Sequence, residues 1–242
     1  MKTAFFALIT LLLAPAAMAQ KAPDDCSWES TSKSRQAVKL RAENDGAAYT
    51  NFNDGRPISL EQWFEMTCKL DPLVPQKLPD DSPVAGAETV RVTLRGYLLA
   101  ARFERDDDHD IHVELGATPN WQGPHIVLEM SAGPDYCSAR QNLWGLVRRD
   151  GCKADQCFLR KPVQIDVSGF VLVGNPPRDA PRDYCNAKVS RGMRKGKEES
   201  QVRGLWRLQP VFSVKETRKQ RRTSHQARAM MIGTADSSQI PC

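Results

Sequence analysis

Two alternating segments joined by an acidic turn place the strongest constraint on the fold of this 242-residue chain. Residues 90–96 read Val-Arg-Val-Thr-Leu-Arg-Gly, and residues 111–115 read Ile-His-Val-Glu-Leu. Successive side chains of a strand point to opposite faces, so each segment presents one apolar face. The turn between them, residues 104–110, contains four aspartates. We therefore predict a β-hairpin, with Gly96 marking a bulge or sharp bend.

The rest of the chain continues this strand pattern and interrupts it once. Three further strands are predicted at 126–130, 163–171 and 205–214. A helix is predicted between the third and fourth strands, because Ser138 and Gln141 have capping-box spacing and the pattern ends at Gly151. Three strands, one helix and two strands are the order of an OB-fold, a five-stranded Greek-key barrel. We predict a mainly β, OB-like barrel, with a plain α+β sandwich as the alternative.

The chain is expected to divide into five parts: 1–19 signal peptide, 20–70 N-terminal extension, 71–88 proline-rich linker, 89–214 barrel domain and 215–242 disordered basic tail. Lys2, an apolar core and Ala17-Met-Ala19 form the pattern of a cleaved export signal. That apolar core is too short to span a bilayer, and no later segment is expected to do so. Ser59 and Gln62 form a second capping box, which predicts a helix over 60–69.

Cysteine usage fits an exported protein. Disulfides are the expected state in an oxidising compartment, whereas a zinc site would need several close pairs. Cys152 and Cys157 are the only close pair. We predict the pairs Cys26–Cys68, Cys137–Cys185 and Cys152–Cys157, with Cys242 left over. Spacing alone does not fix this connectivity.

Positive charge is concentrated near the C-terminus. Residues 191–228 hold twelve Lys or Arg against three Glu, a balance of +9 in a chain whose total is +5. Such asymmetry indicates an anionic partner such as nucleic acid, lipopolysaccharide, lipid or an acidic polymer. A solvated loop and tail are the plainer interpretation. If a partner binds here, Arg191, Arg194 and Lys195 are candidate contacts.

The spacing of several motifs resembles a group of secreted bacterial OB-like domains that are mostly uncharacterised. The motifs are Val92-x-Leu-x-Gly96, Asp110-Ile-His-Val-x-Leu115, Ile126-Val-Leu-Glu129 with Cys137 after it, Val167-x-Gly169 and Trp206-x-Leu-x-Pro-Val211. The resemblance covers residues 90–214 and implies a fold, but no established activity. Two positions depart from it: Gln209 replaces a histidine, and an aspartate is replaced near Asn175. An ionisable site built on those groups would be altered here.

Candidate binding residues fall on one predicted barrel face, because OB barrels bind oligomers over their second and third strands and adjoining loops. They are Arg91, Arg95, Tyr97, Asp110 and His112, with Trp121 as a possible stacking group. Asp110, His112 and Glu114 are expected to share the outward face of the second strand. The acidic turn offers carboxylates and imidazole to a divalent metal, although it lacks the EF-hand spacing.

The leading hypothesis from the sequence is a non-enzymatic binding module for an anionic partner, located in the periplasm or outside the cell. It requires no cofactor or metal. The alternative is a metal-dependent phosphodiesterase or nuclease-like hydrolase on an OB barrel, which rests mainly on fold analogy. The chain has no Gly-x-Ser-x-Gly motif for nucleophilic catalysis.

Overall fold

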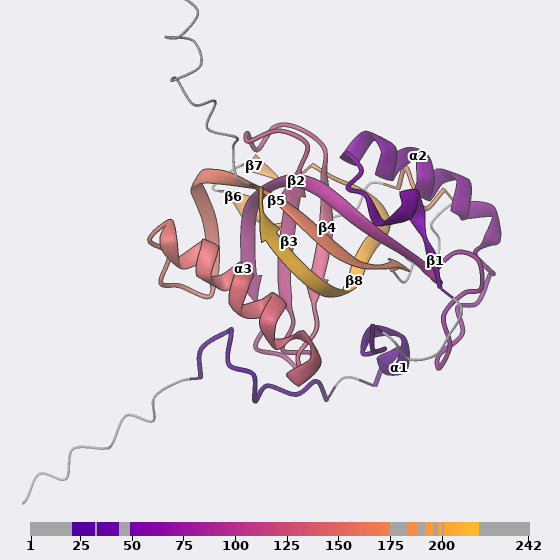
Figure 1. The fold of residues 1–242 in the computed structure, drawn as a ribbon, viewed down its shortest axis with the longest axis horizontal. Coiled ribbons are helices and arrows are strands. Elements are labelled where there is room, and N and C mark those ends of the chain that lie inside the picture. Colours follow the sequence, from indigo (N-terminus) through magenta and orange to yellow (C-terminus); the bar gives the residue numbers. More distant parts are fainter. Residues whose placement is uncertain are drawn as a thin grey trace, which may run out of the picture.

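The computed structural model describes residues 21–31, 33–43, 49–174, 183–187, 192–195, 198–199 and 201–217. Five long strands build the barrel: β2 (Val90–Phe103), β3 (Ile111–Gly116), β4 (His125–Met130), β5 (Gln156–Val173) and β8 (Val202–Glu216). They pair in the order β2-β3-β4-β8-β5, and β5 pairs back onto β2 to close the barrel (Figure 1). Only the β4–β8 pair among these is parallel. The predicted mainly β, OB-like fold is confirmed.

The barrel interior forms as the alternation predicts. Ile111, Val113 and Leu115 of β3 are completely buried in the main apolar core. Gly96 is needed for close packing, because a Cβ at this position would lie 2.7 Å from the side chain of Leu115. The irregularity in strand pairing lies slightly further on, between Leu98 and Ala100.

Two helices flank the barrel. In Figure 1, α3 (Cys137–Arg149) lies at one end and α2 (Leu60–Leu70) at the other. The capping box predicted at Ser59 and Gln62 is confirmed, with both of its hydrogen bonds formed. The capping box predicted at Ser138 is wrong: α3 begins one residue earlier, directly after the 3₁₀ turn η3 (Pro134–Tyr136), and no side chain caps it. Within the described ranges, no helix is both long and apolar enough to cross a membrane.

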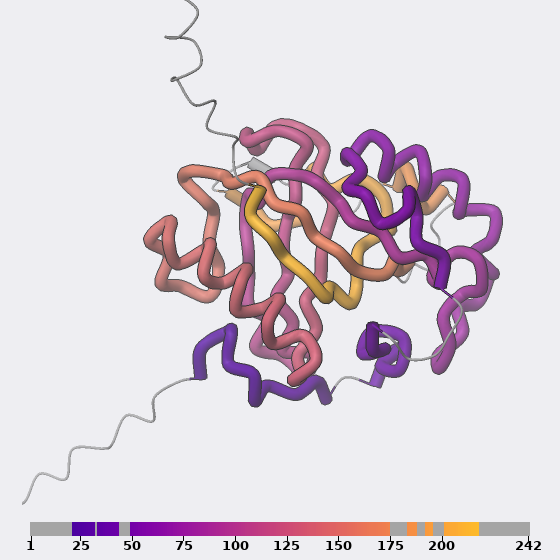
Figure 2. Tube along the Cα trace, in the orientation of Figure 1, coloured from indigo at the N-terminus to yellow at the C-terminus, as the bar shows by residue number. Residues whose placement is uncertain are grey.

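The N-terminal extension adds short elements along the outside of the barrel. They are α1 (Gln36–Lys39), β1 (Thr50–Asn51) and η1 (Phe52–Gly55), and η2 (Asp71–Leu73) follows α2 directly. Near the other end of the chain, just before β8, a separate two-stranded ribbon is formed by β6 (Arg194–Lys195) and β7 (Glu198–Glu199). Figure 2 shows the indigo N-terminal segment passing α3 on its way to α1. Val84, Ala87 and Glu88, from the proline-rich segment before β2, are buried.

Three disulfides join these parts: Cys26–Cys137, Cys68–Cys185 and Cys152–Cys157, with Cα atoms 5.1, 5.0 and 5.9 Å apart. The third predicted pair is confirmed. The predicted pairs Cys26–Cys68 and Cys137–Cys185 are wrong, because Cys68 lies on α2 while Cys137 begins α3 at the other end of the barrel.

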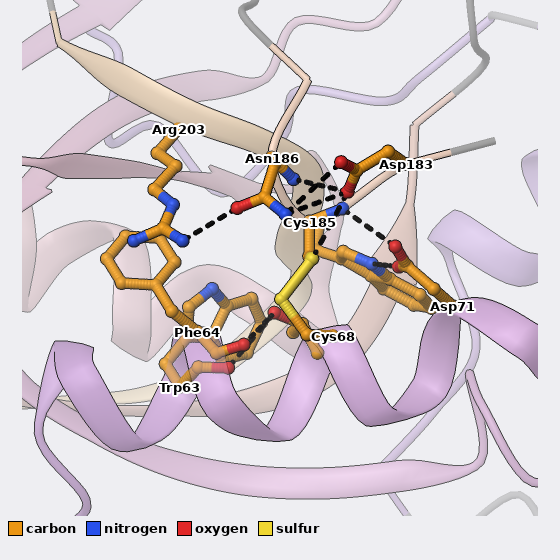
Figure 3. The surroundings of a disulfide bond; sticks show 10 residues. Trp63, Phe64, Cys68, Asp71, Asp183, Cys185, Asn186 and Arg203 are labelled. Carbon is orange, nitrogen blue, oxygen red and sulfur yellow. Dashed lines mark hydrogen bonds between the residues drawn. A yellow bond between two sulfur atoms is a disulfide. The ribbon is translucent and has the colours of Figure 1, made fainter. Parts of the chain in front are cut away.

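The Cys68–Cys185 bridge is reinforced by Asp71 (Figure 3). The Asp71 carboxylate accepts hydrogen bonds from Trp206 Nε1 at 2.6 Å and from the backbone N–H of Cys185 at 3.0 Å. The bridge and Asp71 together attach α2 and η2 to β8 and the segment before it. Cys242 and the residues after 217 lie outside the described part of the chain.

Candidate functional site

A cleft of about 490 Å³ lies on the outer face of β3, β4 and β8. The strands provide one wall, the acidic turn contributes to the rim, and the N-terminal segment contributes Ser34 and two cations. Its ionisable lining residues are Arg35, Lys39, Arg102, Glu104, Asp108, His112, Glu129 and Arg207. We call this site the roofed cleft. It occupies the face on which OB barrels carry their ligands.

Strand register explains why the wall residues meet. His112 of β3 lies opposite Arg102 of β2 on one side and opposite Glu129 of β4 on the other. Facing residues of neighbouring strands project to the same side of a sheet. Arg207 of β8 extends the row, and its Nη1 donates to Glu129 Oε1 at 2.6 Å. The wall is therefore a row of polar side chains across four strands.

The charges of the roofed cleft are compensated pair by pair. Arg102 pairs with Glu104, and Lys39 Nζ lies 2.9 Å from Asp108 Oδ2. Arg35 forms a two-pronged ion pair with Glu88, with both side chains buried. This matching reduces the cost of burying charge beneath the N-terminal segment.

His112 lies in the same wall but takes part in none of these ion pairs. Only 3% of the residue is exposed, it lines the cleft, and its Nε2 has no hydrogen-bond partner among the described residues. Burial lowers the pKa of His112, although Glu129 and Glu104 act in the opposite direction. The imidazole is accordingly neutral near pH 7. An unsatisfied buried polar atom costs about 1–3 kcal/mol, so it is a natural point of contact for a ligand.

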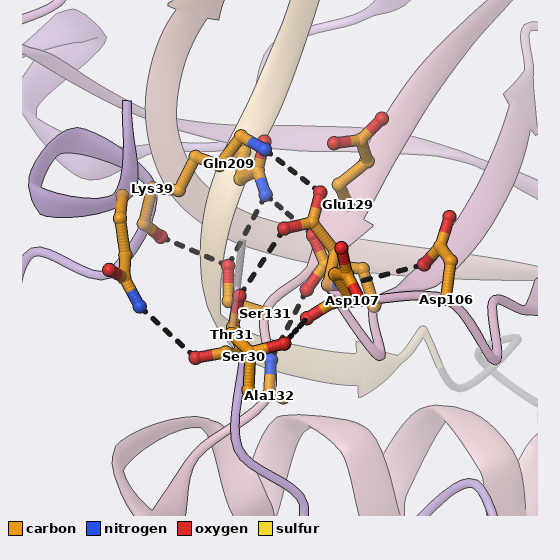
Figure 4. A network of polar contacts seen from close by, with 12 residues as sticks. Ser30, Thr31, Lys39, Asp106, Asp107, Glu129, Ser131, Ala132 and Gln209 are labelled. Atoms are coloured by element: carbon orange, nitrogen blue, oxygen red, sulfur yellow. Dashed lines mark hydrogen bonds and ion pairs between the residues drawn. The ribbon is translucent and has the colours of Figure 1, made fainter. Parts of the chain in front are cut away.

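Asp110, two residues before His112, does not line the cleft. It is buried, and it accepts hydrogen bonds from Gln209 Nε2 at 2.8 Å and from the backbone N–H of Ala132 at 3.3 Å (Figure 4). Burial raises its pKa well above the usual range, and the charges of Glu129 and Asp108 add to the effect. The neighbouring segments enclose Asp110, so this candidate binding residue is buried and not open to a ligand.

Gln209 contacts Asp110, the aspartate of the Asp-Ile-His motif. The two motifs thus meet in the structure although 99 positions separate them. Gln209 Nε2 also lies 3.4 Å from Ser131 Oγ, and Ser131 Oγ donates to the carbonyl of Lys39 at 2.9 Å. This network links the barrel wall to the N-terminal segment.

The acidic turn serves as a docking platform for that same segment. The backbone N–H of Thr31 donates to the carbonyl of Asp107 at 2.7 Å, and Ser30 Oγ donates to Asp108 at 3.3 Å. The ring of Trp28 stacks on His109 with centroids 4.5 Å apart. These contacts give the turn a structural role.

A metal-ligand arrangement is found elsewhere in the described part of the chain. Asp71, Asp183 and Cys185 are the only group of at least three potential ligand atoms found there within 4.8 Å of one another. The sulfur of Cys185 is bonded to Cys68, so it is not a free thiolate. Trp206 and the Cys185 backbone already donate to Asp71.

Several predicted contact residues lie away from the roofed cleft. Arg91 pairs with Glu43, and Arg95 binds Asp166 at 2.7 Å on the β2–β5 surface. Tyr97 packs beside Trp121 in a separate apolar cluster. Arg194 and Lys195 are exposed in β6, and Arg191 lies outside the described residues. Of the predicted set, only His112 lines the cleft.

Glu114, predicted to lie on the outward face of β3, is also buried, because other segments cover that face. Its carboxylate lies 3.0 Å from His125 Nδ1 and accepts a hydrogen bond from the backbone N–H of Met193. Trp121 packs its ring edge-on to His125, with centroids 4.8 Å apart. The expected stacking platform is therefore part of a buried cluster rather than a surface.

Sequence analysis did not identify Arg102, Glu129 or Arg207 as site residues. Arg102 follows a run of small and apolar residues, and Arg207 alternates with core residues of β8. Alternation alone assigns both to the outside of the barrel. The signal that brings them together is strand register, which the sequence does not state.

Comparisons with protein-family models, curated proteins and solved structures found no match for this chain. The interpretation of the roofed cleft therefore depends on its own geometry.

Proposed function

We propose that this protein is an exported binding module that holds an anionic group of its partner in the roofed cleft. The supporting observation is the buried His112, whose Nε2 faces no protein partner in the described chain. The cleft also falls within the range of about 300–1,000 Å³ usual for small-ligand sites. A carboxylate or phosphate oxygen could accept a hydrogen bond from the His112 Nε2–H tautomer.

Two arginines strengthen the proposal. Arg102 and Arg207 stand on either side of His112 in the strand row, and Arg207 Nε is a second buried donor without a partner in the described residues. A guanidinium has five N–H donors, so an arginine that pairs with a glutamate keeps others for a ligand. Apolar residues such as Val127 and Leu172 share the lining and limit competition from water.

Two features that do not depend on the cleft support the proposal that the protein is exported. The N-terminal pattern of a signal peptide and three disulfides in the described chain both suit an oxidising compartment. The proposed location is the periplasm or the extracellular space. The motif resemblance to secreted bacterial OB-like domains agrees with this proposal. The basic residues of 191–228 would then draw an anionic partner toward the barrel.

The metal-dependent hydrolase is not favoured by any contact in the described residues. That hypothesis needs the carboxylates of the acidic turn to converge on one ion. Asp108 instead binds Lys39 and Ser30, and Asp106 accepts the backbone N–H of Asp108 within the turn. We retain the binding function alone.

NMR titration with succinate and with inorganic phosphate tests the proposal. Saturable shifts of the His112 ring signals are expected with at least one anion. His112→Gln should weaken that binding by about tenfold, the worth of roughly one hydrogen bond to a charged group. Arg95→Ala is the matched control, because Arg95 lies outside the cleft. Equal affinities for the wild type and His112→Gln, or no saturable shift with either anion, would contradict the proposal.

A further inference from the structure

A second cavity, of about 760 Å³, is lined by the start of the N-terminal segment, whereas the roofed cleft is lined by residues 34–39 of the same segment. It is formed where the start of that segment meets the last turn of α3 and the loop closed by Cys152–Cys157. Four cations line it: Lys21, Arg105, Arg148 and Lys153. We call it the cationic cavity. These cations come from three separate parts of the sequence, so no single run of basic residues predicts the cavity.

The charges of this cavity are only partly compensated. Arg105 binds Asp155 through Nε at 2.6 Å and Nη2 at 2.8 Å, and Arg148 binds Asp24 at 2.5 Å. No carboxylate of the described residues forms an ion pair with Lys153. Lys21 Nζ lies over the ring of Trp28, 5.2 Å from its centroid. The Asp25 carboxylate also interacts with Lys21, so four cations against three carboxylates leave a local charge of +1.

The positive surface continues beyond the cavity. Arg160 lies beside Gly151, since a Cβ on that glycine would come within 2.8 Å of Arg160 Nη2, and its Nε lies 3.8 Å from the Asp150 carboxylate, which offsets its charge. Lys161 follows it and is exposed. Concave surfaces of one sign focus the electrostatic field and attract counter-charges. The cavity is larger than a single phosphate requires, and the basic residues beside it extend along the surface.

We propose that the cationic cavity binds consecutive phosphate groups of a linear polyanion. Arginine forks and lysine ammonium groups together are the side chains that bind phosphate in proteins. Arg105 and Arg148 are held in place by their carboxylate partners, Lys21 lies near Asp25 over the ring of Trp28, and Lys153 supplies the charge that no carboxylate of the described residues compensates. This inference does not depend on the roofed cleft, because none of these four cations lines that cleft.

Binding of long-chain inorganic polyphosphate to the mature, disulfide-bonded protein tests the proposal by calorimetry. The test variant is Lys21→Glu with Lys153→Glu. The control is Lys69→Glu with Lys77→Glu, which changes net charge equally at exposed lysines that do not line the cavity. The test variant should bind at least tenfold more weakly. Its slope of log K against log salt concentration should be shallower, by about 1 for each phosphate contact removed. The control should bind like the wild type, and circular dichroism should show that both variants fold.

Three outcomes would overturn the inference. Equal losses in the two double variants would mean that net charge alone drives binding. An unchanged test variant would place the polymer elsewhere on the chain. Orthophosphate binding as tightly as polyphosphate would assign the cavity to a single anion and not to consecutive phosphate groups of a chain. None of these results would bear on His112, so the cleft and the cavity can fail separately.

Discussion

The two faces of β3 are both buried, but different parts of the protein cover them. Ile111, Val113 and Leu115 point into the barrel and are enclosed by the apolar faces of the other strands. His112 and Glu114 point outward and are covered by the N-terminal segment and by Gly192 and Met193, which lie between β5 and β8 in the chain. The inner face is closed by strands that the alternation already defines. The outer face is closed by segments outside the barrel strands, which need their own contacts to stay in place.

This difference separates two kinds of stabilisation. The inner face gains from removing apolar area from water, which needs no directional partner. The outer face buries polar groups, which are costly unless each finds a partner. Ion pairs such as Lys39–Asp108, together with the Cys26–Cys137 bridge, hold the N-terminal segment against it. Perturbing these attachments should affect the outer face first.

The largest effect is expected from removing the Cys26–Cys137 bridge. It spans 111 positions, so Cys26→Ser with Cys137→Ser should lower the free energy of unfolding by about 5 kcal/mol in the chain-entropy view. Guanidinium unfolding measures the loss. Amide hydrogen exchange should also increase in residues 21–43 more than in β2. Removing Cys152–Cys157, which spans five positions, should cost only about 2 kcal/mol. Equal losses would show that the N-terminal clip has no special role.

The next effect concerns the buried ion pair beneath the N-terminal segment. Glu88→Gln leaves Arg35 without its carboxylate partner in a site where both side chains are at most 5% exposed. Breaking a buried pair in this way costs about 3–5 kcal/mol. Thermal and guanidinium unfolding of the variant measure the change. A loss under 1 kcal/mol would mean that the pair contributes no more than a surface one.

A smaller and pH-dependent effect is expected at Asp110. Its pKa is raised in the folded state, so its contribution to stability is complete below about pH 3.8 and is lost as pH rises through the folded pKa. Asp110→Asn cannot titrate and should escape that loss. The variant should therefore gain on the wild type with rising pH, by up to about 1.4 kcal/mol per unit until the folded pKa is passed. Parallel stability curves from pH 3 to 8 would contradict this prediction.

The smallest effect is expected on the exposed β2–β5 surface. Arg95 binds Asp166 through two hydrogen bonds, but its side chain is 47% exposed. Surface pairs contribute about 0–1 kcal/mol, so Arg95→Ala should lie in that range and lose its effect in high salt. Urea unfolding at two salt concentrations checks this. A larger loss of unfolding free energy would mean that this exposed ion pair contributes as much as the buried pairs on the outer face of β3.

The sequence predicts the barrel well because strands and helix are marked locally. The alternation of Val90–Gly96 and Ile111–Leu115 and the position of one helix define the strand order. The site is less predictable because its parts meet through long-range contacts. Arg102 and Glu129 become neighbours of His112 only through strand register, and Arg35 reaches the cleft only through folding of the extension. The disulfide pairs have the same origin, because position in space rather than spacing selects them.

The two long disulfides cross in the sequence: Cys26 joins Cys137, while Cys68, which lies between them, joins Cys185. A chain that enters an oxidising compartment N-terminus first presents Cys26 and Cys68 together, before either native partner arrives. Oxidation at that stage joins the wrong pair, and only thiol–disulfide exchange can resolve it. If the protein is exported as proposed, we therefore expect its native pairing to depend on delayed oxidation or on a disulfide isomerase. The yield of native protein should fall most in cells that lack the isomerase.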